Sequence, residues 1–207
     1  MDSLALLMLI SSFLMVVVRN VRYVLLFLSL QGWLLWGLLF QSASNATEVL
    51  VIGLLTLLVK AFLLPLILYR VSQKWPSSAL RIRALPIWGY LLGFVLLLSI
   101  SHIMPPLQAA GILHQQVWFF YGLGSLFLAY LQIMSRKHVL SLISAFIAIE
   151  NALVLVAASI AGQLPLMMEI GMLLDLILST ILLAWLSHLI LRRFKTVDFT
   201  AMRFLRR

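Results

Sequence analysis

Four ionisable side chains lie inside runs of apolar residues. Lys60 stands in "LLTLLVKAFLLPLILYR", Glu150 in "FIAIENALVLV", and Glu169 and Asp175 in "MMEIGMLLDLILS". Placing such a group at the centre of a membrane costs roughly 2.5–3.5 kcal/mol, so these side chains need partners or a wet interior. Burial disfavours the charged form of lysine and carboxyl groups alike, which lets both exchange protons near neutral pH. We therefore predict proton transfer at Lys60, Glu150, Asp175 and Glu169.

A simpler interpretation is that Lys60 pairs with one carboxylate and only holds helices together. One lysine cannot neutralise two acids at the same depth, so a second carboxyl group would still need a partner or a proton. The sequence leaves both interpretations open.

The elements that carry these residues are membrane helices by composition. The chain of 207 residues is 64% hydrophobic and 10% charged, with a mean hydropathy of +1.13, whereas a soluble domain is about 25% charged. Apolar stretches of about 20 residues recur along the whole chain. We predict an all-α integral membrane protein without a separate catalytic domain.

Several kinds of chemistry are excluded for this chain. It contains no cysteine, which rules out thiolate-ligated iron–sulfur clusters, covalently attached haem and disulfides. The four histidines form no i, i+4 pair, and there is no Gly-rich phosphate loop or nucleophile elbow. We expect no cofactor and no metal in this chain. The net charge of +9 does not indicate nucleic acid, because the basic residues cluster between apolar spans.

Seven transmembrane spans fit the sequence: roughly 3–18, 23–40, 48–69, 86–101, 116–134, 139–161 and 166–191. We interpret the first as a retained span. Asp2 precedes it and Arg19 and Arg22 follow it, the reverse of the charge order in a signal peptide. Residues 1–191 then form one transmembrane bundle, and residues 192–207 form a basic cytoplasmic tail.

The basic residues predict the orientation of the bundle. Fourteen of the fifteen lysines and arginines follow spans one, three, five and seven, and the opposite connections contain none. The positive-inside rule then places the N-terminus outside and the C-terminus in the cytoplasm of a prokaryotic inner membrane. Lys60 is the exception, because it lies inside span three.

Depth in the membrane can be estimated from the rise of about 1.5 Å per residue. Lys60, Glu150 and Asp175 come near the midplane on three different helices, and Glu169 lies nearer the outer surface. The residues expected to support them are Asn151, Gln31, Thr56, Ser179, Pro65 and His188. Because proline removes a backbone hydrogen bond, we expect Pro65 to bend span three about one turn below Lys60.

The first three and the last three spans share a layout. "RNVR" precedes a span with Gln31 at its middle, and "RKH" precedes a span with Glu150 at its middle. The hypothesis that follows is that residues 1–69 are a degenerate three-helix repeat of residues 116–191. Residues 70–115 would then supply a connecting loop and the fourth span.

Four stretches of the chain resemble the HyfE-like family of membrane proteins from hydrogenase-4-type complexes: "LVKAFLLPLI", "AIEN", "MEIGMLLDLI" and "TVDFTAMRFL". The last three spans also look like the NuoK-like three-helix component of respiratory complex I and its relative in Mrp-type cation/proton antiporters. The resemblance implies that Glu150 is the first relay acid. It leaves open whether Asp175 or Glu169 is the second.

The resemblance also implies an assembly. The chain would be a proton-translocating, energy-coupling subunit of a complex I-like machine of the group 4 nickel–iron hydrogenase or formate hydrogenlyase type. Its partners would be antiporter-like and other complex I-like membrane subunits, a cytoplasmic hydrogenase and iron–sulfur module, and lipids. The nickel–iron site and the clusters would belong to those partners, so this chain would be a non-catalytic subunit of an oxidoreductase.

Two alternatives come from the same residues. The chain could be a non-conducting structural adaptor that bridges antiporter-like subunits and the redox module, with its basic tail docking on that module. It could also be a subunit of a cation/proton antiporter. The sequence does not decide between protons and sodium ions as the transported species.

Overall fold

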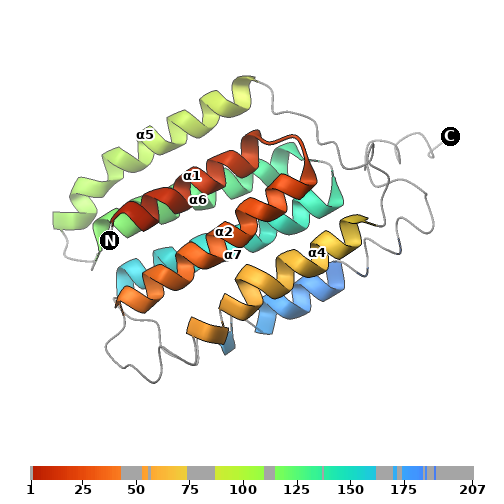
Figure 1. Cartoon of the computed structure of the whole chain (residues 1–207). Helices are drawn as coiled ribbons and strands as arrows, with labels where there is room; N and C mark the ends of the chain where they lie inside the picture. Colours follow the sequence, from red (N-terminus) through yellow and green to blue (C-terminus); the bar gives the residue numbers. More distant parts are fainter. Residues whose placement is uncertain are drawn as a thin grey trace.

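The computed structural model describes residues 2–42, 53–55, 57–73, 87–109, 115–136, 138–161, 170–171, 174–183, 185 and 189, and these residues are almost entirely helical. The helices are α1 (Asp2–Val17), α2 (Val21–Ser42), the π-helix η1 (Leu57–Leu63), α4 (Leu64–Gln73), α5 (Ile87–Ala109), α6 (Gln116–Ser135) and α7 (Val139–Ala161). A shorter apolar helix covers Leu174–Leu183. Figure 1 shows the helices running in roughly the same direction or its reverse.

Within the described residues, four helical stretches are long and apolar enough to cross a membrane: Val21–Phe40, Gly53–Gln73, Gln116–Ser135 and Val139–Ala161. Three shorter apolar helices accompany them there: Ser3–Val17, Leu91–Ile100 and Leu174–Leu183. These helices confirm the prediction of an all-α membrane protein in fold class. A helix suits a membrane because it satisfies its own backbone hydrogen bonds in lipid.

The predicted boundaries agree best for α7, which covers the predicted residues 139–161. The fourth predicted span, roughly residues 86–101, corresponds to α5, which continues through Pro105 and Pro106 to Ala109. The fixed φ of proline is compatible with a helix. Each proline therefore removes one hydrogen bond without forcing the chain to leave the helix.

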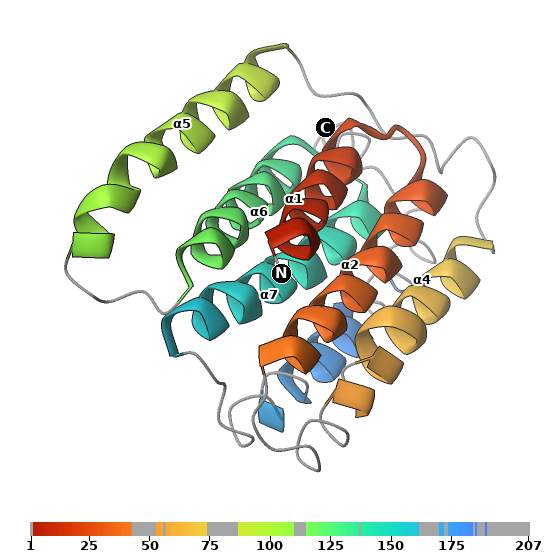
Figure 2. The ribbon, with the colours of Figure 1, turned by 60° about the vertical axis from the view of Figure 1, so that its left-hand side comes forward.

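Four helices form the centre of the molecule. Helix α1 packs against α2 and α6, and α7 also packs against α2 and α6, so the four helices close into a bundle. The π-helix η1 and α4 lie against α2, and α5 packs on α6 at the edge of the molecule (Figures 1 and 2). Each of the central helices thus has neighbours on several sides.

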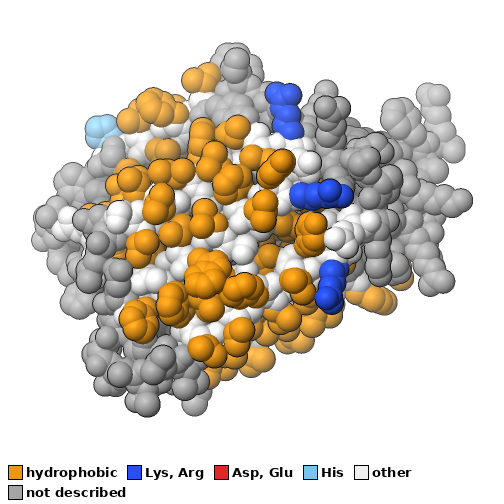
Figure 3. All heavy atoms as spheres, viewed as in Figure 1, with side chains coloured by type: hydrophobic (Ala, Val, Ile, Leu, Met, Phe, Trp, Pro, Cys, Tyr) orange, Lys and Arg blue, Asp and Glu red, His pale blue; other side chains and the backbone are white. Residues whose placement is uncertain are grey.

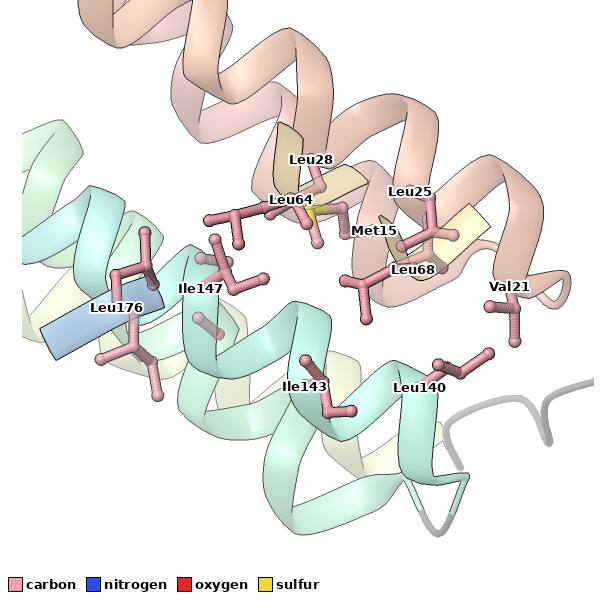
Figure 4. Packing of buried hydrophobic residues seen from close by; sticks show 14 of the residues in the cluster. Met15, Val21, Leu25, Leu28, Leu64, Leu68, Leu140, Ile143, Ile147 and Leu176 are labelled. Carbon is pink, nitrogen blue, oxygen red and sulfur yellow. The ribbon is translucent and has the colours of Figure 1, made fainter. Parts of the chain in front are cut away.

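Two large clusters of buried apolar side chains fill the bundle. The larger cluster includes Met15, Leu28, Leu64, Ala129, Ile147 and Leu176, and Figure 4 shows its residues from α1, α2 and α4 facing those of α7. The smaller cluster includes Met8, Leu35, Trp118 and Leu155. Since lipid tails are as apolar as these side chains, the clusters stabilise the fold through close packing and not through removal from water.

Apolar side chains also cover the outside of the bundle. Leu26 is 63% exposed, Leu92 52% and Leu182 62%. Figure 3 shows apolar side chains over most of the described part of one face, with lysine and arginine side chains gathered near one end. A surface of this kind suits contact with lipid or with other membrane helices.

The basic turn after α6 meets the basic turn after α1. Arg136 is 2% exposed, and its guanidinium donates hydrogen bonds to the carbonyl oxygens of Val18 (2.9 Å), Met15 (3.4 Å) and Val16. Carbonyl groups at the end of a helix have no hydrogen-bond partner within the helix, and they carry partial negative charge. A cationic guanidinium there supplies the missing hydrogen bonds and a favourable positive charge. The two turns therefore lie at the same end of the bundle.

The ends of corresponding helices keep a constant spacing in the two halves of the chain. Val17 and Ser135 end α1 and α6, and Val21 and Val139 begin α2 and α7, so each pair is 118 residues apart. Helix α1 also packs on α6, and α2 on α7. This spacing agrees with the repeat hypothesis, which stays a prediction.

Candidate functional site

Lys60 and Glu150 form an ion pair inside the molecule. The Nζ atom of Lys60 lies 3.1 Å from Oε1 of Glu150, and the two side chains are 2% and 14% exposed. Lys60 belongs to η1, and Glu150 stands near the middle of α7. The structure therefore brings together two of the four residues for which the sequence predicts proton transfer.

The π-helix η1 positions Lys60. A π-helix has wider turns than an α-helix, and short π-helical segments are frequent at functional sites. Pro65 stands two residues after Leu63, where η1 ends. It lacks the backbone N–H that would bind the carbonyl of Ala61 in an α-helix. The Oγ of Ser29 on α2 donates a hydrogen bond of 2.6 Å to that carbonyl instead. The irregular segment thus includes Lys60 itself, whereas the bend expected at Pro65 stays a prediction.

Gly32 lets α2 approach η1 closely. A Cβ atom at this position would lie 2.7 Å from the backbone nitrogen of Ala61 and 2.8 Å from the carbonyl carbon of Lys60. Such distances are too short for any side chain, so only glycine permits this contact. The close approach of the two backbones holds the segment that carries Lys60.

Asp175 does not join the buried pair. It is exposed on the Leu174–Leu183 helix, where the Oγ of Ser179 donates a long hydrogen bond of 3.5 Å to its Oδ1. Leu176 and Thr180, each 1% exposed, are the residues that this helix turns inward. Asp175 is still close enough to Glu150 for the two carboxyl groups to interact electrostatically. Of the three groups predicted near the midplane, the structure therefore pairs Lys60 with Glu150 and leaves Asp175 exposed.

Two of the predicted supporting residues are buried polar amides. Gln31 and Asn151 are both 0% exposed. The Nε2 of Gln31 donates a hydrogen bond of 2.8 Å to Oγ of Ser12, whose hydroxyl donates to the carbonyl of Met8 at 3.0 Å. Neither side-chain polar atom of Asn151 has a hydrogen-bond partner within the described part of the chain.

Three predicted residues lie outside the described part of the chain: Glu169, Thr56 and His188. The basic tail, residues 192–207, lies outside it as well.

Sequence reasoning missed the residues that hold the site from neighbouring helices. Ser29 and Ser12 bind Ala61 and Gln31, and Arg136 was used only as an indicator of orientation. One signal was available: Pro65 leaves a carbonyl without its amide partner, so a hydroxyl on an adjacent apolar helix was to be expected. Nothing in the sequence indicated which helix would supply it.

The arrangement can hold or move a proton. A lysine and a carboxyl group in hydrogen-bond contact can exist as an ion pair or, after one proton moves from nitrogen to oxygen, as a neutral pair.

Comparisons of the chain with models of protein families, with curated proteins and with solved structures find no match. The chemistry of these side chains is thus the basis for a function.

Proposed function

We propose that the chain is a proton-translocating, energy-coupling membrane subunit of a complex I-like redox assembly in a prokaryotic inner membrane. The observation that carries the proposal is the Lys60–Glu150 contact of 3.1 Å inside a bundle of apolar helices. Two ionisable groups in this position require a physical reason, because each costs several kcal/mol to insert into the membrane. A relay needs such a pair, because its two members can exchange a proton.

The proton would move in two steps. In the first, an N–H bond of the Lys60 ammonium breaks and an O–H bond forms on Glu150, which leaves a neutral amine and a neutral acid. In the second, Glu150 passes the proton through water to Asp175, and Lys60 is reprotonated from the opposite side. The contact of 3.1 Å between Lys60 and Glu150 supports the first step. Glu169, which lies outside the described residues, stays the alternative acceptor in the second step.

The proposal places seven spans in the membrane, with the N-terminus outside and the C-terminus in the cytoplasm. The helical segments at all seven predicted positions support this count. The meeting of the two basic turns at Arg136 supports the orientation, since lysines and arginines are retained on the cytoplasmic side.

The partners in this proposal are antiporter-like membrane subunits, other complex I-like membrane subunits and a cytoplasmic hydrogenase and iron–sulfur module. The exposed carboxyl group of Asp175 supports a membrane partner, because a charge on a lipid-facing surface is costly unless another protein covers it. Nickel–iron and iron–sulfur chemistry would belong to the cytoplasmic partners, in agreement with a chain that contains no cysteine.

The test is Glu150→Gln in the native complex, measured as proton uptake by inverted membrane vesicles. We expect a loss of translocation of at least about tenfold per assembled complex, because glutamine keeps the shape but cannot carry the proton. Asp198→Asn, which removes an acid from the predicted tail, is the matched control and should leave translocation unchanged. Full translocation in Glu150→Gln would refute the proposed role.

A structural adaptor is the second candidate, and the same ion pair favours it. A direct contact of 3.1 Å between Lys60 and Glu150 can pin η1 to α7 without any proton transfer, because opposite charges attract strongly where water is excluded. The two candidates differ in what happens to proton translocation when both charges are removed together.

A further inference from the structure

The bundle contains a second polar centre, which has no charge. On α1, Ser12 is 3% exposed and stands between Met8 of the smaller apolar cluster and Met15 of the larger one. On α2, Gln31 stands in the same way between Leu28 of the larger cluster and Leu35 of the smaller one. The hydrogen bond between Gln31 and Ser12 confirms that the two lie at one level.

The other two bundle helices repeat the arrangement. Ser125 on α6 comes between Trp118 of the smaller cluster and Ala129 of the larger one. Asn151 on α7 comes between Ile147 of the larger cluster and Leu155 of the smaller one. A layer of four neutral polar side chains, one from each helix, therefore separates the two apolar clusters. We call the four residues Ser12, Gln31, Ser125 and Asn151 the neutral layer.

Several polar atoms of the neutral layer lack partners within the described residues. These atoms are Oε1 of Gln31, Oγ of Ser125, and Nδ2 and Oδ1 of Asn151. All three side chains are at least 99% buried. Buried polar atoms in proteins almost always have a hydrogen-bond partner in protein or in ordered water, so these atoms require one.

The neutral layer adjoins the ion pair. Asn151 follows Glu150 directly on α7, and Gln31 precedes Gly32, whose backbone abuts that of Lys60. The ligand must therefore be small and must both donate and accept hydrogen bonds, because the unpartnered atoms include the Nδ2 donor of Asn151 and the Oε1 acceptor of Gln31. Water meets these conditions, and buried waters typically make about three hydrogen bonds to groups of this kind.

We propose that the neutral layer is an internal water-binding site at the centre of the α1–α2–α6–α7 bundle. Its waters bind Gln31 Oε1, Ser125 Oγ and the amide of Asn151. They extend the polar level of the Lys60–Glu150 pair across the bundle. A contribution of these waters to proton transfer rests on the proposed function, whereas the binding of water does not.

Pulsed X-ray radiolysis in H₂¹⁸O tests the site on the full chain in lipid nanodiscs. Hydroxyl radicals form from water where it is bound, and methionine next to such water takes up ¹⁸O. Met8 and Met15 lie one turn on either side of Ser12, and both are 0% exposed. We expect both methionines to be labelled in the wild type. Asn151→Leu and Gln31→Leu should each reduce that labelling severalfold. Met134, which is 83% exposed, should be labelled equally in the wild type and in both variants.

Two serine variants complete the experiment if a leucine variant fails to fold. Ser125→Ala removes an unpartnered hydroxyl and should lower the labelling of Met8 and Met15. Ser159→Ala is the matched control, because the Oγ of Ser159 already donates a hydrogen bond of 2.5 Å to the carbonyl of Val156. This variant should leave the labelling of Met8 and Met15 unchanged. Unlabelled Met8 and Met15 in the wild type, or labelling that none of the three neutral-layer variants changes, would overturn the proposal. The outcome is independent of vesicle translocation in Glu150→Gln, so the two proposals can fail separately.

Discussion

Lys60 and Glu150 differ in their access to the surroundings. Lys60 is 2% exposed and Glu150 14% exposed, so protons reach or leave the pair more readily through the carboxyl group. The pair is also costly to form, because both groups lose their hydration on insertion. A partner of opposite charge at 3.1 Å offsets that cost. Stability and proton exchange therefore depend on the same contact and must be separated by experiment.

Removing one member of the pair should destabilise the protein more than removing both. Lys60→Met leaves the Glu150 carboxyl group buried without its counter-charge, and breaking buried pairs in this way costs about 3–5 kcal/mol. Lys60→Met/Glu150→Gln leaves no unpaired charge, so its melting temperature should recover most of the loss. The measurement is the apparent melting temperature of each purified variant in detergent.

The same double variant separates a relay from an adaptor. A relay predicts that stability returns while proton translocation in vesicles does not, because neither side chain can then carry a proton. An adaptor predicts that both return. Recovery of translocation in the double variant would exclude the proposed relay and leave the pair as a structural contact.

At the scale of elements, η1 depends on three features that come from different parts of the sequence. Pro65 withholds an amide hydrogen, Ser29 supplies a hydroxyl to the Ala61 carbonyl, and Gly32 allows the two backbones to touch. Together they stabilise a π-helical segment that an isolated helix would not adopt, since α-helical bonds are more favourable in the absence of such partners.

A methyl group at Gly32 should disturb this contact. Gly32→Ala would place a Cβ atom 2.7 Å from the backbone of Ala61, so α2 and η1 would have to separate. Forced overpacking of this kind costs about 1–3 kcal/mol, and it should lower both the apparent melting temperature and proton translocation. Lys60 would move away from Glu150 as η1 shifts.

Gly37→Ala is the matched control on the same helix. Its Cβ atom would meet only Leu4 Cδ1 at an ordinary distance of 3.5 Å, and alanine favours the helix by about 0.5–1 kcal/mol over glycine. We expect its melting temperature to be equal to or above that of the wild type. An equal response of Gly32→Ala and Gly37→Ala would contradict the role given to the close approach.

At the scale of the whole molecule, Arg136 joins the two halves of the chain. Its guanidinium binds carbonyl oxygens of Met15, Val16 and Val18, which lie more than a hundred residues earlier. Hydrogen bonds to charged groups contribute about 1.5–3 kcal/mol each. Arg136→Gln should therefore lower the apparent melting temperature markedly. Arg22→Gln, which removes an exposed charge near the same end, should change it little. Equal melting temperatures for the two variants would show that the contact is unimportant.

The exposed acid predicts an interface with another membrane protein of the assembly. Asp175→Asn should leave the melting temperature of the isolated chain unchanged, because Asp175 is exposed and its one hydrogen bond within the described residues is the long one from Ser179. In the native complex the same variant should weaken co-purification of the membrane subunits and reduce proton translocation. Ser179→Ala, on the same face, should leave both intact. Loss of stability in the isolated Asp175→Asn chain would place the residue inside the fold instead.

The sequence by itself determined that the chain consists of apolar helices. The boundaries of α7 agree with those predicted, and the described part of each predicted span contains helical structure. The reason is that lipid sets the length of an apolar helix and excludes other backbone conformations, whatever its neighbours are.

Only the tertiary structure decided which polar groups meet. Position in a span gives depth, which is one coordinate, whereas the neighbours and rotation of each helix give the other two. Lys60, Glu150 and Asp175 were all placed near the midplane, yet η1 and α7 turn the first two together while the Leu174–Leu183 helix turns Asp175 outward. Rotation and neighbours follow from side-chain packing between distant segments, such as Gly32 against Ala61, and such packing is not encoded in the depth of a residue.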